Sequence, residues 1–121
     1  MALSQYQYVS VEDYFLLDER DSEHRYDYID GHVRMQAGGT PDHAQVGANC
    51  IGVLYGALEG KPCGIYSSDV RVRLSETRYV HPDVAVSCDR RDKGQEKTIS
   101  FPCLVIEVLS PSTETCQRPH A

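Results

Sequence analysis

The sequence predicts a single domain of the α+β (mixed α/β) class, and three observations lead to this class. Residues 11–17 and 41–59 carry apolar side chains at the spacing of helices with one covered face. Several shorter stretches alternate every second residue, as strands do. The chain has 121 residues, which suffices for one domain and not for two. The order of elements is therefore helix, hairpin, helix and several strands, without repeats.

The first helix is expected over residues 11–17. Ser10 and Asp13 resemble a capping box in which Asp replaces the usual Glu. The charged residues 18–25 are interpreted as a loop or a solvated helix end. Residues 26–35 predict a β-hairpin, because the Asp-Gly pair at its centre suits a turn in which both residues have positive φ.

The second helix is expected over residues 41–59. Thr40 can cap its N-terminus, Pro41 suits its first turn, and Gly60 suits its end. Three glycines lower its helix propensity but would allow it to pack closely against a sheet. These are Gly47, Gly52 and Gly56.

The rest of the chain predicts strands. Residues 65–67, 70–74 and 79–87 are strand-like, and a polar loop follows at residues 89–97. Residues 104–109 form a nearly continuous apolar run, which is typical of a central strand covered on both faces.

Composition and charge exclude several classes of protein. The formal net charge of −6 argues against a general nucleic-acid coat, which would need a basic surface. It allows an enzyme that contacts DNA locally through metal ions. No apolar run approaches the roughly 18–20 residues that span a membrane, and the N-terminus lacks the features of a signal peptide. We therefore expect a cytoplasmic protein with no membrane partner.

The cysteines favour free thiols in a reducing compartment. Their number is odd and no two have the CxxC spacing of zinc ligands, so a structural zinc site is not expected. Several are expected to be buried as small apolar side chains. They are Cys50, Cys63, Cys88, Cys103 and Cys116.

Two carboxylates lie in apolar strand-like segments, Asp83 and Glu107. An ionised carboxylate in such a place must be paired, neutralised or bound to a metal. If the two strands are neighbours, the pair would form an oxygen-rich site that suits Mg²⁺ or Mn²⁺, which can activate water for phosphodiester cleavage. Each residue alone is explained more simply by an ion pair, and three arginines are near in sequence. These are Arg71, Arg73 and Arg78.

Arg71 and Arg73 themselves lie on one face of a predicted strand. They could face a DNA backbone, although a solvated strand face is the simpler interpretation.

The residues around these carboxylates resemble the Uma family, whose members are described as restriction endonucleases of the PD-(D/E)xK nuclease superfamily. The resemblance runs in order from about residue 6 to residue 114. Its most specific part is the string EVLSPST with a Pro-Asp pair upstream. The matching segments are RYDYIDG (25–31), PDH (41–43), PC (62–63), SSDVR (67–71), PDVAV (82–86) and PCLVIEVLSPST (102–113).

The resemblance implies a restriction-endonuclease-like fold, with a mixed sheet flanked by helices. Asp83 would be the metal-binding Asp, and Glu107 the acidic member of the D/E-x-K element. Asp27 matches a position where the family usually has Glu and would be a supporting acid. His43 matches a family His at the start of the second helix, where it could orient a phosphate or a water; the alternative is a simple solvent-exposed His.

The sequence departs from the family pattern at the expected lysine. Leu109 stands two residues after Glu107, where the superfamily has Lys, and Uma-type proteins supply this Lys from the following helix. No Lys follows Lys97 in this chain, Arg118 stays charged at any ordinary pH, and Pro119 opposes a helix. We therefore expect a C-terminally truncated domain that lacks the family's last helix and strand.

Two functions from different classes follow from the sequence. The first is a Mg²⁺- or Mn²⁺-dependent endonuclease that acts on DNA. The second is a non-catalytic module of the same fold that acts through self-association, so the expected partners are DNA and further copies of this chain. Acyl-transfer chemistry and nucleotide binding are unsupported, because the chain contains no G-x-S-x-G, G-x-x-x-x-G-K-[ST] or G-x-G-x-x-G motif.

Overall fold

The computed structural model describes residues 8–109, which form two helices, a short 3₁₀ turn and eight strands. The expectations for Arg118, Pro119 and the rest of the C-terminal segment lie outside these residues. Within the described part, neither helix is long and apolar enough to cross a membrane. The elements are α1 (Val11–Arg20), β1 (Tyr26–Ile29), β2 (His32–Met35), α2 (Pro41–Ala57), β3 (Gly64–Ser67), β4 (Arg71–Ser75), β5 (Arg78–Val80), β6 (Val84–Ser87), η1 (Arg90–Asp92), β7 (Thr98–Ile99) and β8 (Leu104–Ile106).

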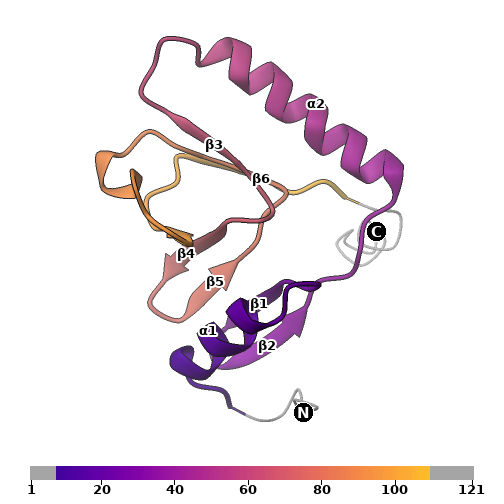
Figure 1. Ribbon diagram of the computed structural model, residues 1–121, viewed down its shortest axis with the longest axis vertical. Helices are drawn as coiled ribbons and strands as arrows, with labels where there is room; N and C mark the ends of the chain where they lie inside the picture. The colour runs from indigo at the N-terminus through magenta and orange to yellow at the C-terminus, as the bar shows by residue number, and fades with distance from the viewer. Residues whose placement is uncertain (1–7, 110–121) are drawn as a thin grey trace, which may run out of the picture.

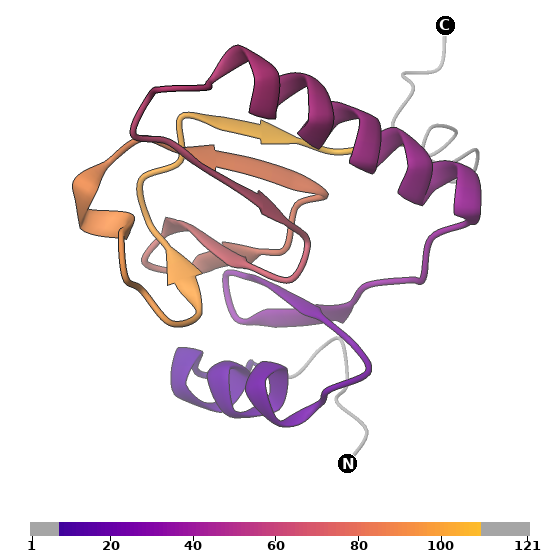
Figure 2. The same cartoon turned by 45° about the horizontal axis from the view of Figure 1, so that its top comes forward.

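The strands form two sheets, and the predicted mixed α+β class is confirmed. The larger sheet has the order β2-β1-β5-β4-β7 and is antiparallel except for the parallel pair β4–β7. The smaller sheet has the order β3-β6-β8 and is antiparallel. Helix α2 packs against β3 and β6, whereas α1 lies at the other end of the molecule against β1 (Figures 1 and 2).

The N-terminal elements follow the local signals of the sequence. The Ser10 side chain accepts a hydrogen bond from the Asp13 backbone N–H, as the capping pattern predicts. Asp30 and Gly31 have φ values of 48° and 93°, as the hairpin turn requires. Helix α1 runs to Arg20 rather than residue 17, because the Asp18 carboxylate turns inward and accepts a hydrogen bond from the Tyr26 N–H.

Helix α2 begins as expected but does not use its glycines as predicted. The Thr40 hydroxyl caps it by accepting from the His43 N–H, and it ends at Ala57, two residues before the expected end. The expectation of close packing through its glycines is wrong. A Cβ atom at any of the three would meet nothing within 4 Å, so these positions face open space; they are Gly47, Gly52 and Gly56.

The single strand predicted over residues 79–87 is in fact two strands. β5 belongs to the larger sheet and β6 to the smaller one. The break falls at Pro82, which has no N–H to donate to a ladder. The chain therefore passes from one sheet to the other through His81, Pro82 and Asp83.

Within residues 8–109, the apolar run at residues 104–109 does not form a central strand. Within the described residues, β8 pairs only with β6 and ends its sheet. Leu104 and Val105 are 40% and 37% exposed. An apolar run indicates that its side chains favour burial, but it does not determine whether the strand has one neighbour or two in the sheet.

Arg71 lies in a buried ion network, so the solvated strand face is the wrong interpretation for it. Its guanidinium is 3.2 Å from both the Asp18 and the Glu19 carboxylates, and it lies over the Phe15 ring at 4.1 Å. The His81 ring approaches the same Asp18 carboxylate at 2.8 Å. Burial alone would raise the pKa of Asp18, but the His81 hydrogen bond and the Arg71 charge hold it below its usual value.

The cysteines are not all free thiols, contrary to expectation. Cys63 and Cys88 form a disulfide, whereas Cys50 and Cys103 are free. The register of β3 with β6 pairs Gly64 with Ser87, so the next pair outward is Cys63 with Cys88. Sequence spacing cannot reveal this pairing, because it depends on which strands are neighbours.

We predict that Arg71→Met costs about 3–5 kcal/mol in the free energy of unfolding, because it leaves the Asp18 carboxylate buried without its guanidinium partner. Arg78→Met is the matched control. It breaks the exposed pair with Asp30 and should cost at most about 1 kcal/mol. Urea unfolding of both variants measures the difference, and equal losses would contradict a stabilising role for the buried network.

Candidate active site

The β6–β8 ladder places Asp83 opposite Glu107. The register pairs Val84 with Ile106, and extending it by one residue at the same end pairs the two acids. Asp83 directly precedes β6 and Glu107 directly follows β8. The Asp83 carboxylate also accepts a hydrogen bond of 2.7 Å from the Val108 N–H, which holds the two segments together beyond the end of the ladder.

Asp83 changes the ionisation of Glu107. Partial burial and the negative charge of Asp83 raise the pKa of Glu107 to about 7, and hydrogen bonding between the two carboxyl groups acts in the same direction. Two of the three arginines proposed as ion-pair partners bind other carboxylates, since Arg71 binds Asp18 and Arg78 binds Asp30. The ionised carboxylates of Asp83 and Glu107 therefore repel each other unless a proton or another cation lies between them.

His43 lies beside this pair rather than free in solvent. Its Nε2 is 3.0 Å from the Val108 carbonyl oxygen and 3.4 Å from the Asp83 carboxylate, and its side chain is 24% exposed. A carbonyl oxygen can only accept, so Nε2 carries the hydrogen. Gly39 packs against the other ring nitrogen so closely that a Cβ at this position would lie 2.6 Å from Nδ1.

Asp27 is buried and held by three donors. Its carboxylate accepts from the His81 backbone N–H at 3.0 Å, from the Gln36 amide at 3.1 Å and from the Arg34 guanidinium at 3.3 Å. The negative charge of Asp27 also contributes to the raised pKa of Glu107. Asp27 therefore acts on the carboxylate pair through its charge, from a fixed position.

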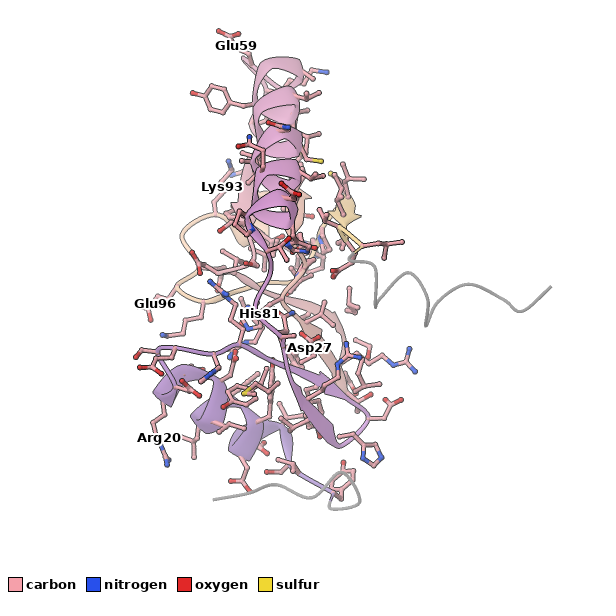
Figure 3. The ribbon with its side chains drawn as sticks, turned by 90° about the vertical axis from the view of Figure 1, so that its right-hand side faces the viewer. Arg20, Asp27, Glu59, His81, Lys93 and Glu96 are labelled. Atoms are coloured by element: carbon pink, nitrogen blue, oxygen red, sulfur yellow. A yellow bond between two sulfur atoms is a disulfide. The ribbon has the colours of Figure 1, made fainter. Side chains whose placement is uncertain are left out.

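Gln36 is a site residue that the sequence reasoning missed. Its amide nitrogen bridges the Asp27 carboxylate and the His81 carbonyl oxygen, at 3.1 and 2.7 Å. Figure 3 shows Asp27 and His81 at the middle of the molecule, between α1 and α2. The hairpin contained the signal for Gln36. Asp27 faces Arg34 across the hairpin, and a residue two positions further lies on the same face.

A cleft of about 500 Å³ brings these groups together. Its lining includes all four acids and bases that the sequence analysis selected, namely Asp27, His43, Asp83 and Glu107. Leu109, which stands two residues after Glu107, also lines the cleft and makes that part of its wall apolar.

The carboxylates of Asp83 and Glu107 fit a divalent cation that has only a few protein ligands. Within residues 8–109, no group of three or more His, Cys, Asp and Glu side chains is arranged to hold a metal ion. Mg²⁺ does not need such a cage, because it keeps several waters and is often bound through one or two carboxylates. Asp83 and Glu107 supply two, and their mutual repulsion is what a cation would relieve.

Comparison with known proteins gives consistent matches. A family model, Uma2, described as "Putative restriction endonuclease", matches residues 11–119. The uncharacterized protein slr1290 of Synechocystis is 38% identical over 111 residues, which cover 91% of this chain and 58% of that protein.

A crystal structure from Anabaena variabilis, described as a putative nuclease belonging to DUF820, superposes with a TM-score of 0.70 at 19% identity. The match covers 90% of this chain and 64% of that one, so this chain spans less than two thirds of either relative. At this identity the likeness shows the fold alone. Because the family model extends over most of the chain, the chain belongs to the Uma2 family of putative restriction endonucleases.

Proposed function

We propose that the cleft hydrolyses phosphodiester bonds with the help of a divalent cation, and that DNA is the substrate. The observation that carries this proposal is the opposed pair of Asp83 and Glu107 in a cleft, where partial burial and the Asp83 charge raise the pKa of Glu107. The family and the fold support a nuclease.

Asp83 and Glu107 are the residues that would hold Mg²⁺ or Mn²⁺. When bound, such a cation lowers the pKa of water and neutralises phosphate charge. The oxygen ligands suit these hard cations better than softer ones.

The other cleft residues have roles that depend on their contacts. Asp27 is fixed by its three donors and maintains a negative charge close to the pair. His43 is oriented by the Val108 carbonyl and Asp83, and Gly39 leaves room for its ring. The Arg34 side chain is 80% exposed at the cleft and could donate to a phosphate oxygen, which would offset the acidic charge of the chain locally. Leu109 offers no amine, so we propose that cleavage by this chain is weak.

We predict that the protein cleaves plasmid DNA weakly with Mn²⁺ or Mg²⁺, and that Asp83→Ala or Glu107→Ala abolishes cleavage. Each substitution should also weaken Mn²⁺ binding by about 10-fold to 100-fold or more, measured by calorimetry, since each removes a carboxylate ligand. Asp89→Asn is the control, because Asp89 pairs with Arg91 away from the cleft and its substitution should change neither property. Cleavage that survives EDTA, or survives both alanine substitutions, would refute the proposal. Parallel assays on single-stranded DNA and RNA identify the substrate.

We predict that Gly39→Ala reduces cleavage, whereas Gly38→Ala does not. A Cβ at position 39 would lie 2.6 Å from His43 Nδ1, and the ring would have to move away from Asp83 and Val108. A Cβ at position 38 meets nothing within 4 Å, so the neighbouring glycine is a matched control. Equal activity of the two variants, with equal Mn²⁺ affinity, would contradict a role for the orientation of His43.

A second candidate function is self-association without catalysis. It is favoured by the exposed apolar side chains on β8 and α2, because soluble monomers rarely leave large apolar patches uncovered. β8 also ends its sheet within the described residues, and such an edge can pair with a strand of another copy. The apolar side chains are Val53 and Tyr55 on α2, and Leu104 and Val105 on β8.

If β8 pairs with β8 of a second copy, we predict that Val105→Lys converts the dimer to a monomer, so that the mass measured by sedimentation velocity falls by half. A charged side chain on the edge strand opposes pairing with a second copy. Val53→Lys places the same charge on α2, and an unchanged mass for this variant would show that β8 rather than α2 carries the contact. A wild-type protein that stays monomeric across the concentration range would eliminate this candidate.

A further inference from the structure

Three cysteines meet at one end of the smaller sheet, away from the carboxylates. Cys63 directly precedes β3, Cys88 directly follows β6, and Cys103 directly precedes β8. Cys63 and Cys88 are joined by a disulfide. The free thiol of Cys103 lies with its Sγ atom 3.9 Å from the Sγ atom of Cys88.

The strand order explains why Cys88 has a sulfur neighbour on each side. β6 is the middle strand, with β3 on one side and β8 on the other, and β3 and β6 run side by side beneath α2 in Figure 1. The β3–β6 register brings Cys63 opposite Cys88. On the other side, Val86 pairs with Leu104, and the Cys103 N–H donates to the Val86 carbonyl at 2.8 Å. Cys103 is therefore fixed by backbone hydrogen bonding next to the disulfide.

The exposure of the three residues allows reaction. Cys88 and Cys103 are exposed, and Cys63 is partly buried. A thiol must lose its proton to attack a disulfide, so access to water is a requirement for the attacking residue. Cys103 is free, exposed and adjacent, and it meets this requirement.

We propose that Cys63, Cys88 and Cys103 form an internal thiol–disulfide exchange site. The Cys103 thiol gives its proton to water, and the thiolate attacks the Sγ atom of Cys88. The Cys88–Cys103 bond forms while the Cys63–Cys88 bond breaks, and Cys63 leaves as a thiolate that takes a proton from water. Two sulfurs are oxidised before and after the exchange, so the step needs no oxidant or reductant.

The exchange changes which strands are covalently joined. The Cys63–Cys88 bond joins β3 to β6, whereas the Cys88–Cys103 bond would join β6 to β8. β8 is the strand that leads into Glu107, and three register pairs connect it to β6. The proposal concerns the opposite end of the sheet from the cleft and does not depend on the nuclease function.

The exchange can be followed in a protein that carries Cys50→Ser and Cys116→Ser, so that only the three cysteines of the site remain. The protein is oxidised with glutathione disulfide, desalted, and incubated at about pH 8, where a fraction of ordinary thiols is ionised. Samples are quenched in acid, alkylated and mapped by mass spectrometry. We expect the Cys88–Cys103 peptide to appear while Cys63 becomes alkylated, with a rate independent of protein concentration.

Three outcomes of this experiment would overturn the proposal. The protein could keep only the Cys63–Cys88 bond throughout, it could form a Cys63–Cys103 bond instead, or all three cysteines could remain reduced after oxidation. A rate that rises with protein concentration would show exchange between molecules and would also overturn it.

Two variants test the central role of Cys88. Under the same oxidation, Cys63→Ser should form the Cys88–Cys103 bond, with loss of alkylation at both residues. Cys88→Ser should form no bond within the chain, and both remaining cysteines should be alkylated. A Cys63–Cys103 bond in the Cys88→Ser variant, or two free thiols in the Cys63→Ser variant, would contradict the proposal.

Discussion

The passage of the chain through Pro82 is the constraint on which the rest of the structure depends. Because Pro82 cannot donate to a ladder, the strand that begins in the larger sheet stops and the chain enters the smaller sheet. His81, on one side of the break, enters the buried network with Asp18 and Arg71. Asp83, on the other side, directly precedes β6 and lies opposite Glu107. One residue thus separates a carboxylate network that stabilises the fold from a carboxylate pair that is available for chemistry.

These two groups of charges differ in how well they are compensated. In residues 8–109, every buried side-chain nitrogen and oxygen has a hydrogen-bond partner. The Asp18 carboxylate receives donors from His81, Arg71 and the Tyr26 N–H, and its pKa falls despite its burial. The Glu107 carboxyl has Asp83 as its neighbour instead, and its pKa rises. The fold satisfies its buried polar groups but brings these two acids together at the cleft, and a positive charge between them would relieve their repulsion, which supports the proposed cation.

The sequence predicted those features that depend on residues close together in the chain. The hairpin at residues 26–35 and the caps of both helices are decided by neighbouring side chains and backbone angles, and they are confirmed. The break at Pro82 was missed because apolar alternation continues across it. The buried position of Arg71 and the Cys63–Cys88 bond depend on which strands become neighbours, which no local pattern records. For the candidate site, the sequence selected four residues that line one cleft but missed Gln36, whose role depends on its reach toward Asp27 and the His81 carbonyl.

The ladder between β6 and β8 connects the two unusual ends of the smaller sheet. Asp83 and Glu107 lie at one end, and Cys88 and Cys103 lie at the other, with three register pairs between them. A slip of this ladder by one residue would bring Ile106 or Val108 opposite Asp83 in place of Glu107, because these two apolar residues flank Glu107 in the chain. β8 borders only β6 within the described residues, so few contacts resist such a slip. A covalent bond between Cys88 and Cys103 would oppose it directly, and it would hold the register on which the carboxylate pair depends.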